Sequence, residues 1–128
     1  MQILENGSVT SPRGFTAAAV AAEIKYTGRT DLAIVYSKVP AQAAAVYTLN
    51  RFKAAPLRVT EENISNGVAQ AIVVNSGIAN AGMGAEGMRL AREMSDCAAE
   101  ALDIAKDDVI VASTGVIGMP LPMDRVKA

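Results

Sequence analysis

The chain has 128 residues, of which 51% are hydrophobic, and its 12 basic and 13 acidic residues give a formal net charge of −1. This composition excludes a disordered chain, and mixed charges without a basic block argue against nucleic-acid binding. No apolar run nears the length of a membrane span, and the N-terminus lacks the basic region of a secretory signal. We therefore expect a cytoplasmic protein with no membrane partner.

Histidine is absent from the sequence, and Cys97 is its single cysteine. The chain thus lacks the commonest general base and the commonest zinc ligand, and it cannot form an intramolecular disulfide. We expect neither a metal nor a bound cofactor. Any chemistry must use hydroxyls, amides, carboxylates, lysine or groups from another chain.

In the first half of the chain, short apolar runs alternate with turn residues. Residues 15–25 are rich in alanine, which favours a helix, but the glycines on either side favour a short strand. Residues 31–37 are apolar throughout their middle and predict a buried strand. Pro40 indicates a turn, after which residues 43–49 are expected to return as another strand.

A polar segment with two cations follows, at residues 50–56. Arg51 and Lys53 could attract a carboxylate, although a solvated loop is the simpler interpretation. Thr60 is a good helix N-cap, and it predicts a short helix that ends near Gly67.

The second half has the pattern strand, helix, strand. Residues 69–74 and 109–113 predict buried strands, and a loop rich in glycine and amides, 75–84, follows the first of them. Residues 86–102 predict an amphipathic helix, and residues 121–128 resemble the first turns of another. The apolar stripe of the long helix recurs at spacings of four, three and four, at Leu90, Met94, Cys97 and Ala101. Cys97 is therefore expected to be a packed thiol.

This order of elements predicts a layered α/β fold. The chain fits one domain, and because its last segment has no C-cap we expect residues 1–128 to be a single incomplete domain.

Both predicted buried strands of the second half end in hydroxyl, amide and glycine residues. If the strands are neighbours, Asn75-Ser76-Gly77 and Ser113-Thr114-Gly115 line one rim. A hydroxyl beside an unshielded glycine N–H can hold a carbonyl oxygen or an oxyanion, which makes Thr114 and Gly115 candidate catalytic residues. An ordinary turn is the simpler interpretation of these residues alone.

Several segments together resemble one family, the ornithine acetyltransferases, which are the bifunctional glutamate N-acetyltransferases of arginine biosynthesis. The similarity covers nearly the whole chain, and its motifs are long and correctly ordered. They are Pro-Arg-Gly-Phe at 12–15, Asp-Leu-Ala at 31–33, Asn-Arg-Phe-Lys-Ala-Ala-Pro at 50–56, Val-Val-Asn-Ser-Gly with Ala-Asn-Ala within 73–81, Ser-Thr-Gly-Val-Ile-Gly at 113–118 and Leu-Pro-Met at 121–123.

The resemblance implies a cytoplasmic, autoprocessed enzyme of α and β chains with the α/β/β/α architecture of N-terminal-nucleophile hydrolases. A threonine that begins the β chain would take an acetyl group from N-acetylornithine and pass it to glutamate. Thr114 and Gly115 would form the oxyanion hole of this multifunctional acyltransferase. The partners implied are the β chain, in an α2β2 heterotetramer, and the two substrates. Whether acetyl-CoA is also a co-substrate stays open, and no substrate-binding residue is assigned.

The sequence departs from the family pattern at three positions and lacks one region. Ile78 replaces the usual asparagine, Gly82 a frequent cysteine and Glu23 the usual glycine. Nothing matches the Lys-Gly…Pro-Asn-Met-Ala-Thr region that carries the cleavage site and the nucleophile. We therefore expect the N-terminal part of an α chain, inactive alone. Two alternatives are a non-catalytic assembly or binding domain, and part of an N-terminal-nucleophile amidase or aminopeptidase.

Overall fold

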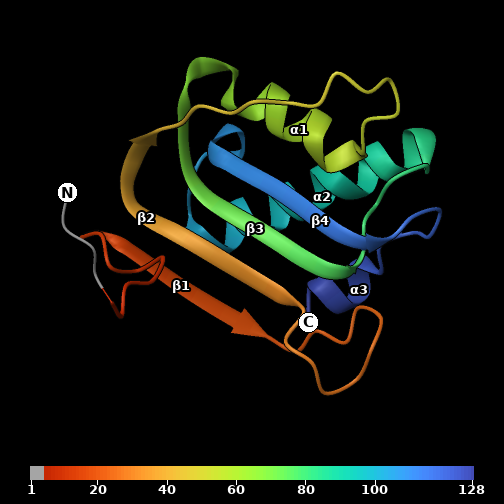
Figure 1. Cartoon of the computed structure of the whole chain (residues 1–128), viewed down its shortest axis with the longest axis horizontal. Helices are drawn as coiled ribbons and strands as arrows, with labels where there is room; N and C mark the ends of the chain where they lie inside the picture. Colours follow the sequence, from red (N-terminus) through yellow and green to blue (C-terminus); the bar gives the residue numbers. More distant parts are fainter. Residues whose placement is uncertain (1–4) are drawn as a thin grey trace.

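The computed structural model describes residues 5–128, which form one four-stranded sheet with helices packed on it (Figure 1). The sheet order is β1-β2-β3-β4, antiparallel except for β3 and β4, which are parallel and joined through α2. The α/β class is confirmed. The elements are β1 Phe15–Val20, β2 Leu32–Gln42, α1 Ala55–Asn63, η1 Ile64–Asn66, β3 Val68–Ile78, α2 Gly84–Leu102, η2 Lys106–Asp108, β4 Val109–Val116 and α3 Met123–Val126.

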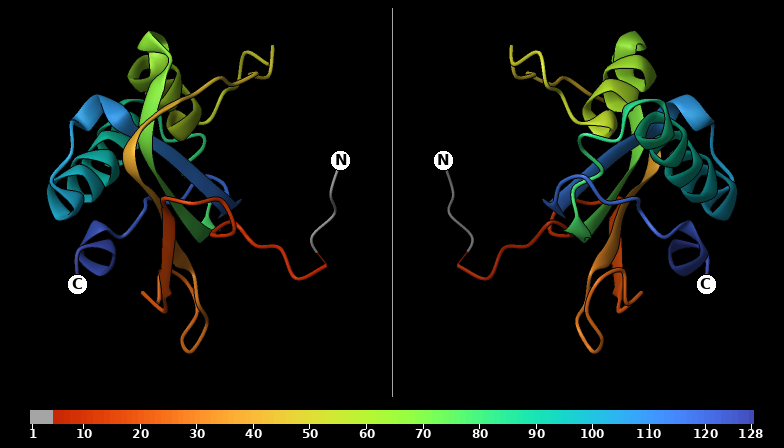
Figure 2. Two further views of the ribbon diagram at one scale, coloured as in Figure 1. Left: turned by 90° about the vertical axis from the view of Figure 1, so that its left-hand side faces the viewer. Right: turned by 90° about the vertical axis from the view of Figure 1, so that its right-hand side faces the viewer.

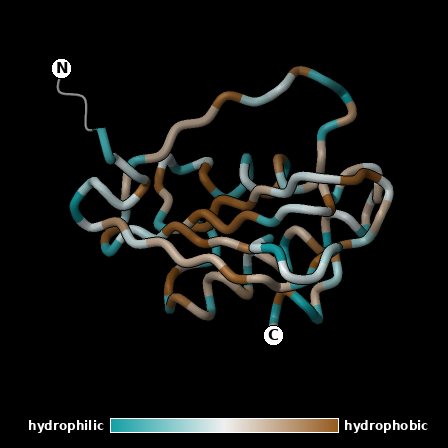
Figure 3. Tube along the Cα trace, turned by 60° about the horizontal axis from the view of Figure 1, so that its bottom comes forward, coloured by the Kyte–Doolittle hydropathy of each residue, from teal (hydrophilic) through white to brown (hydrophobic). Residues whose placement is uncertain are grey.

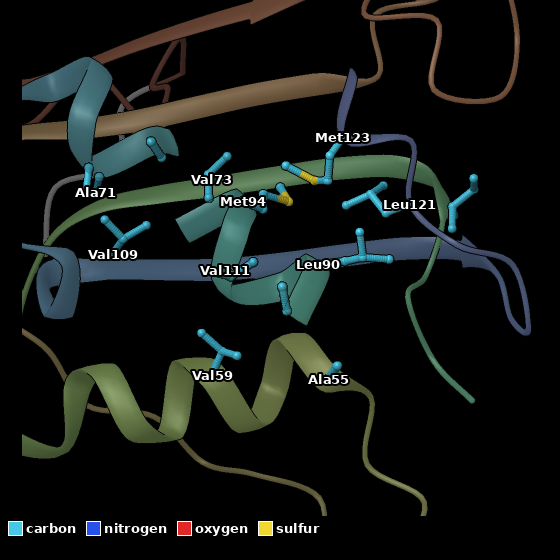
Figure 4. Close-up of a cluster of buried hydrophobic side chains, with 14 of the residues drawn as sticks. Ala55, Val59, Ala71, Val73, Leu90, Met94, Val109, Val111, Leu121 and Met123 are labelled. Carbon is cyan, nitrogen blue, oxygen red and sulfur yellow. The ribbon is translucent and has the colours of Figure 1, made fainter. Parts of the chain in front are cut away.

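The helices lie on one face of the sheet, as the edge-on views in Figure 2 show. The core between the layers combines valines of β3 and β4 with Val59, Leu90 and Met94 of the helices and several small alanines. Figure 4 shows Val59 of α1 directed towards Val111 of β4, and Met94 of α2 beside Val73 of β3. Met94 and Val59 are each 1% exposed, so both helices bury side chains against the parallel strands.

Among residues 5–128, no helix lies over the other face of the sheet. Phe15, Val35, Ile72 and Ile110 line a shallow cavity of about 260 Å³ on this face. Ile72 is 39% exposed although it lies mid-strand. Figure 3 shows hydrophobic stretches running along the sheet in the described chain. Both faces of this sheet are therefore built for burial, and the helices cover one of them.

The alanine-rich segment is a strand, as the bounding glycines favoured, but it ends at Val20. After β1 the chain loops out, and the Asp31 carboxylate accepts hydrogen bonds from the backbone N–H groups of Ala22 (2.8 Å) and Ile24 (2.7 Å). Glu23 lies between them at φ 55°, in the left-handed region that glycine adopts without strain. This backbone conformation therefore explains why glycine suits this position.

Two predictions for the segment after residue 37 were wrong. Pro40 does not end the strand, because β2 continues to Gln42 through an irregularity in its pairing with β3 between Tyr36 and Ala41. A bulge of this kind tolerates a proline, which cannot donate to the ladder. Residues 43–49 form no strand, and Val46 and Leu49 are 99% and 97% exposed.

The helix predicted to start at Thr60 starts five residues earlier, at Ala55. Pro56 lies in its first turn, where a missing N–H costs nothing, so the proline begins the helix that it was expected to precede. Thr60 is a buried helical residue, 5% exposed. Its hydroxyl donates to the carbonyl oxygen of Val111 and accepts from the N–H of the same residue, both at 2.9 Å.

We expect Thr60→Val to lower the free energy of unfolding by about 1–3 kcal/mol, because it leaves both backbone groups of Val111 buried and unpaired while preserving the side-chain shape. Urea denaturation of the variant and the parent chain measures the difference. Thr48→Val, at an exposed site, is the matched control and should change stability by less than about 0.5 kcal/mol. Equal effects of the two substitutions would contradict this prediction.

Candidate active site

The polar ends of β3 and β4 lie side by side, as the sequence predicted on the condition that these strands are neighbours. The parallel register pairs three residues of each strand: Asn75 with Ser113, Ser76 with Thr114, and Gly77 with Gly115. These residues are within the strands, which run to Ile78 and Val116, so neither cluster is the loop or turn expected from sequence. The strand ends continue because the neighbouring strand satisfies their backbone groups.

Alternation along the strands separates the cluster between the two faces of the sheet. Asn75 and Ser113 share a face with Val73 and Val111 of the core, and Asn75 is 1% exposed. The Asn75 Nδ2 donates to the carbonyl of Ile78 at 2.9 Å. Within residues 5–128, the Asn75 Oδ1 and the Ser113 Oγ have no hydrogen-bond partner.

Thr114 is on the opposite face, together with Ser76, and both residues are exposed. Its hydroxyl is therefore presented on the side of the sheet without helices, on the same face as Ile110, which lies four residues earlier in β4.

Gly115 packs directly on the backbone of Gly77. A Cβ at Gly115 would lie 2.2 Å from the Gly77 carbonyl carbon and 2.4 Å from its oxygen, which no side chain can tolerate. Its φ of 131° also lies in the region that L side chains rarely adopt. The residue is glycine for two independent steric reasons.

We infer from the alternation of the ladder that the N–H of Gly115 lies on the side of β4 away from β3. Val111 directs both its N–H and its carbonyl to Thr60, at the outer edge of β4. Along a strand of a parallel sheet, successive residues direct their N–H and carbonyl groups to opposite sides in turn. Ser113 and Gly115, two and four residues after Val111, therefore direct theirs to the same outer side as Val111. The Val116 carbonyl accepts from the N–H of Ala79, on the β3 side, which fits this alternation. The strand thus leaves an outward N–H beside an exposed hydroxyl.

A lysine that no sequence pattern singled out lies at the same strand end. A Cβ on Gly77 would lie 3.0 Å from the Lys25 Cβ, so the side chain of Lys25 begins against the Gly77–Gly115 contact. Its ammonium is 4.9 Å from the centre of the Tyr26 ring, and a hydrogen bond from Lys25 lowers the pKa of the Tyr26 hydroxyl. Lys25 is 52 residues from Gly77 in the chain, so only the folded loop brings them together.

Cys97 is half-buried on α2, as its place on the apolar stripe predicted. Burial raises the pKa of its thiol, which disfavours the reactive thiolate. Within residues 5–128 no three His, Cys, Asp or Glu side chains gather in a way that could hold a metal ion. Among the same residues, no helix is both long and apolar enough to span a membrane.

Together, the fold and this site define an α/β protein in which two parallel strands end at an exposed hydroxyl and an outward glycine N–H. Comparison with known proteins gives the family. The model of the ArgJ family matches residues 16–128, and the chain belongs to the ArgJ family. The resemblance to the ornithine acetyltransferases is thereby confirmed.

Curated relatives carry the description arginine biosynthesis bifunctional protein ArgJ. The protein of Dehalococcoides mccartyi is 49% identical over 99% of this chain, and that of Symbiobacterium thermophilum is 54% identical over 95%. These matches cover 32% and 31% of the two relatives, so the chain spans about a third of their length.

Two solved structures share the fold. The crystal structure of the arginine biosynthesis bifunctional protein argJ of Bacillus halodurans superposes with a TM-score of 0.93 at 50% identity, over 97% of this chain and 65% of that one. The ornithine acetyltransferase of Mycobacterium tuberculosis, complexed with ornithine, superposes with a TM-score of 0.90 at 41% identity, over 97% and 67%.

Proposed function

We propose that residues 1–128 are the N-terminal part of the α chain of an autoprocessed acetyltransferase of arginine biosynthesis. The complete enzyme moves an acetyl group from N-acetylornithine to glutamate through an ester on a threonine that begins the β chain. Membership of the ArgJ family, and the ornithine with which the related Mycobacterium tuberculosis enzyme is complexed, support this substrate class. The chain's span of a third of its relatives supports its being one part of the enzyme.

The observation that carries the proposal is the outward N–H of Gly115 beside the exposed Thr114 hydroxyl. When the nucleophilic threonine attacks the acetyl carbonyl, the carbonyl oxygen gains negative charge in the tetrahedral intermediate. Two fixed donors stabilise that charge more than they stabilise the neutral substrate, which lowers the barrier. Collapse of the intermediate then releases ornithine and leaves the acetyl ester for transfer to glutamate.

The open face of the sheet supports an α/β/β/α architecture, in which a second sheet packs where this chain has no helix. Apolar Ile72 and Ile110 lie on that face, four residues before Ser76 and Thr114 in their strands. We place the β chain and the rest of the α chain there, in an α2β2 heterotetramer in the cytoplasm. On this proposal residues 1–128 are a single incomplete domain and have no acetyl-transfer activity alone.

Intact mass spectrometry of the protein isolated from its native coding region, with N-terminal sequencing of every co-purifying chain, tests this function. A partner chain that begins with threonine is the expected result. A single 13.3 kDa species that is monomeric and has no encoded partner would overturn the proposal in favour of an assembly or binding domain. Assays with and without acetyl-CoA then decide whether it is a second acetyl donor.

A further inference from the structure

A second cleft lies on the helix side of the molecule, between the N-terminal ends of α1 and α2. Its volume is about 420 Å³, and its walls carry the cations Arg51, Lys53 and Arg58. We propose that this cleft binds the phosphate group of a phosphorylated small molecule. The inference rests on the cleft alone and stands whether or not the chain takes part in acetyl transfer.

The charges at the cleft are not balanced within the described residues. None of the residues that line it is acidic. Lys53 pairs with Glu61 at 3.4 Å, whereas Arg51 and Arg58 form no salt bridge within residues 5–128. Three cations and one carboxylate leave two positive charges, which matches the charge of a phosphate ester near neutral pH. A zwitterionic amino acid would bring an ammonium group against these cations, so the lining selects against it.

Two helix N-termini add to this positive potential. The nine-residue α1 begins with neither a side-chain cap nor an acidic residue in its first turn, so the partial positive charge of its N-terminus is uncompensated. The 19-residue α2 also begins without a side-chain cap, and Glu86 in its first turn is paired with Arg89. A Cβ at Gly84, the first residue of α2, would meet no atom within 4 Å, so a ligand can approach its backbone closely. Anions bind helix N-termini in this way.

Asn80 holds the two helices in place at the wall of the cleft. Its carbonyl accepts from the N–H of Ala55 at 3.4 Å, and its Nδ2 donates to the carbonyl of Gly87 at 2.9 Å. Asn80 is fully buried, and its Oδ1 has no partner within residues 5–128. This buried oxygen lies against Gly87, where a Cβ would be 3.0 Å away, so Asn80 shapes the wall of the cleft and does not itself contact a ligand.

The cleft also offers an exposed aromatic ring, with which a ligand group other than the phosphate can make contact. Phe52 is 63% exposed and lies against Gly82, where a Cβ would be 3.2 Å from the ring. Gly82, which replaces a frequent cysteine of the family, therefore leaves space for the ring. The methionines Met83 and Met88 complete an apolar wall. A phosphate ester that carries a flat apolar group, such as a nucleotide, matches both parts of the cleft: the phosphate faces the cations and the flat group faces the apolar wall.

Titration of the ¹⁵N-labelled chain, followed by NMR, tests the proposal. Inorganic phosphate should shift the amide signals of Phe52, Gly84 and Ala85 in a saturable way, while sodium acetate at equal ionic strength should not. Adenosine 5′-monophosphate should bind roughly tenfold more tightly than phosphate because it adds a contact with Phe52. Equal affinity for the two probes would indicate a site for free phosphate and overturn the nucleotide-like part of the proposal.

The double variant Arg51→Gln/Arg58→Gln should raise the dissociation constant for phosphate at least roughly tenfold, since each arginine removed is a charge-assisted donor. The double variant Arg13→Gln/Arg29→Gln, an equal change of charge at two exposed sites outside the cleft, should leave it within about twofold. Well-dispersed spectra of both variants establish that they are folded. Unchanged binding by the double variant, or an equal loss in the control, would overturn the proposal.

Discussion

Replacing Thr114 with alanine in the complete enzyme proposed above is expected to lower kcat for acetyl transfer roughly 10²–10³-fold. The substitution removes one of the two donors proposed for the developing oxyanion, and it leaves the outward N–H of Gly115 in place. Thr114 is exposed, so stability should change by less than about 0.5 kcal/mol. Steady-state kinetics with N-acetylornithine and glutamate measure the effect, which should fall on kcat and leave KM nearly unchanged.

Two further variants separate the loss of a donor from the loss of bulk. Thr114→Ser retains the hydroxyl and should restore most of the activity. Ser76→Ala removes the cross-strand hydroxyl on the same face and should change kcat by no more than a few-fold. An alanine variant at Thr114 that keeps parental kcat would assign this residue to a structural strand end and refute the oxyanion role.

Gly115→Ala is expected to be the most destabilising single substitution at the site, by about 3 kcal/mol or more. Its methyl group would lie 2.2 Å from the Gly77 carbonyl carbon, and backbone on both sides leaves no flexible side chain to move aside. In a chain of this size such a loss lowers Tm by roughly 10 °C. Thermal unfolding followed by circular dichroism measures the shift.

Gly118→Ala is the matched control for this prediction. Gly118 also has a positive φ, 73°, but a Cβ there would meet nothing within 4 Å. It therefore isolates the backbone cost, about 1–2 kcal/mol, from the steric cost. Equal losses of Tm in the two variants would show that the contact with Gly77 contributes nothing, and would contradict the structural interpretation of Gly115.

The parts of the fold that the sequence predicted are those in which one physical signal dominates. The apolar runs at 69–74 and 109–113 lie in β3 and β4, and the stripe at 86–102 lies in α2. Burial on both faces of a strand, or along one side of a helix, requires a regular pattern of apolar residues. That pattern can be recognised in the sequence without knowledge of the tertiary contacts.

The errors arose where tertiary contacts decide the local structure. Thr60 has the chemistry of an N-cap, yet its hydroxyl bonds a strand 51 residues away. The run 43–49 has strand-like composition, but no neighbouring strand pairs with it, and Val46 is left exposed. A strand-like composition is not sufficient for a strand, because a neighbouring strand must also be present to pair with it.

The candidate site was predictable in its residues and not in its geometry. Hydroxyls and glycines at two strand ends were visible in the sequence, and so was the condition that the strands be neighbours. The face on which Thr114 lies, the direction of the Gly115 N–H and the proximity of Lys25 follow from the register and from a loop between β1 and β2. The similarity to a known family supplied the role, which the residues alone left open.

The close approach of Gly77 and Gly115 has a consequence for how the two strands find each other during folding. If β4 slipped along β3 by one position, Thr114 or Val116 would lie opposite Gly77, where Gly115 adopts a φ of 131° that L side chains rarely adopt and that brings a Cβ onto the Gly77 backbone. Misaligned pairings are thus penalised at their ends even though the Val- and Ile-rich centres of the strands would tolerate them. The glycine pair therefore disfavours competing registers of the parallel strands. These strands pair slowly because their contacts are distant in the chain.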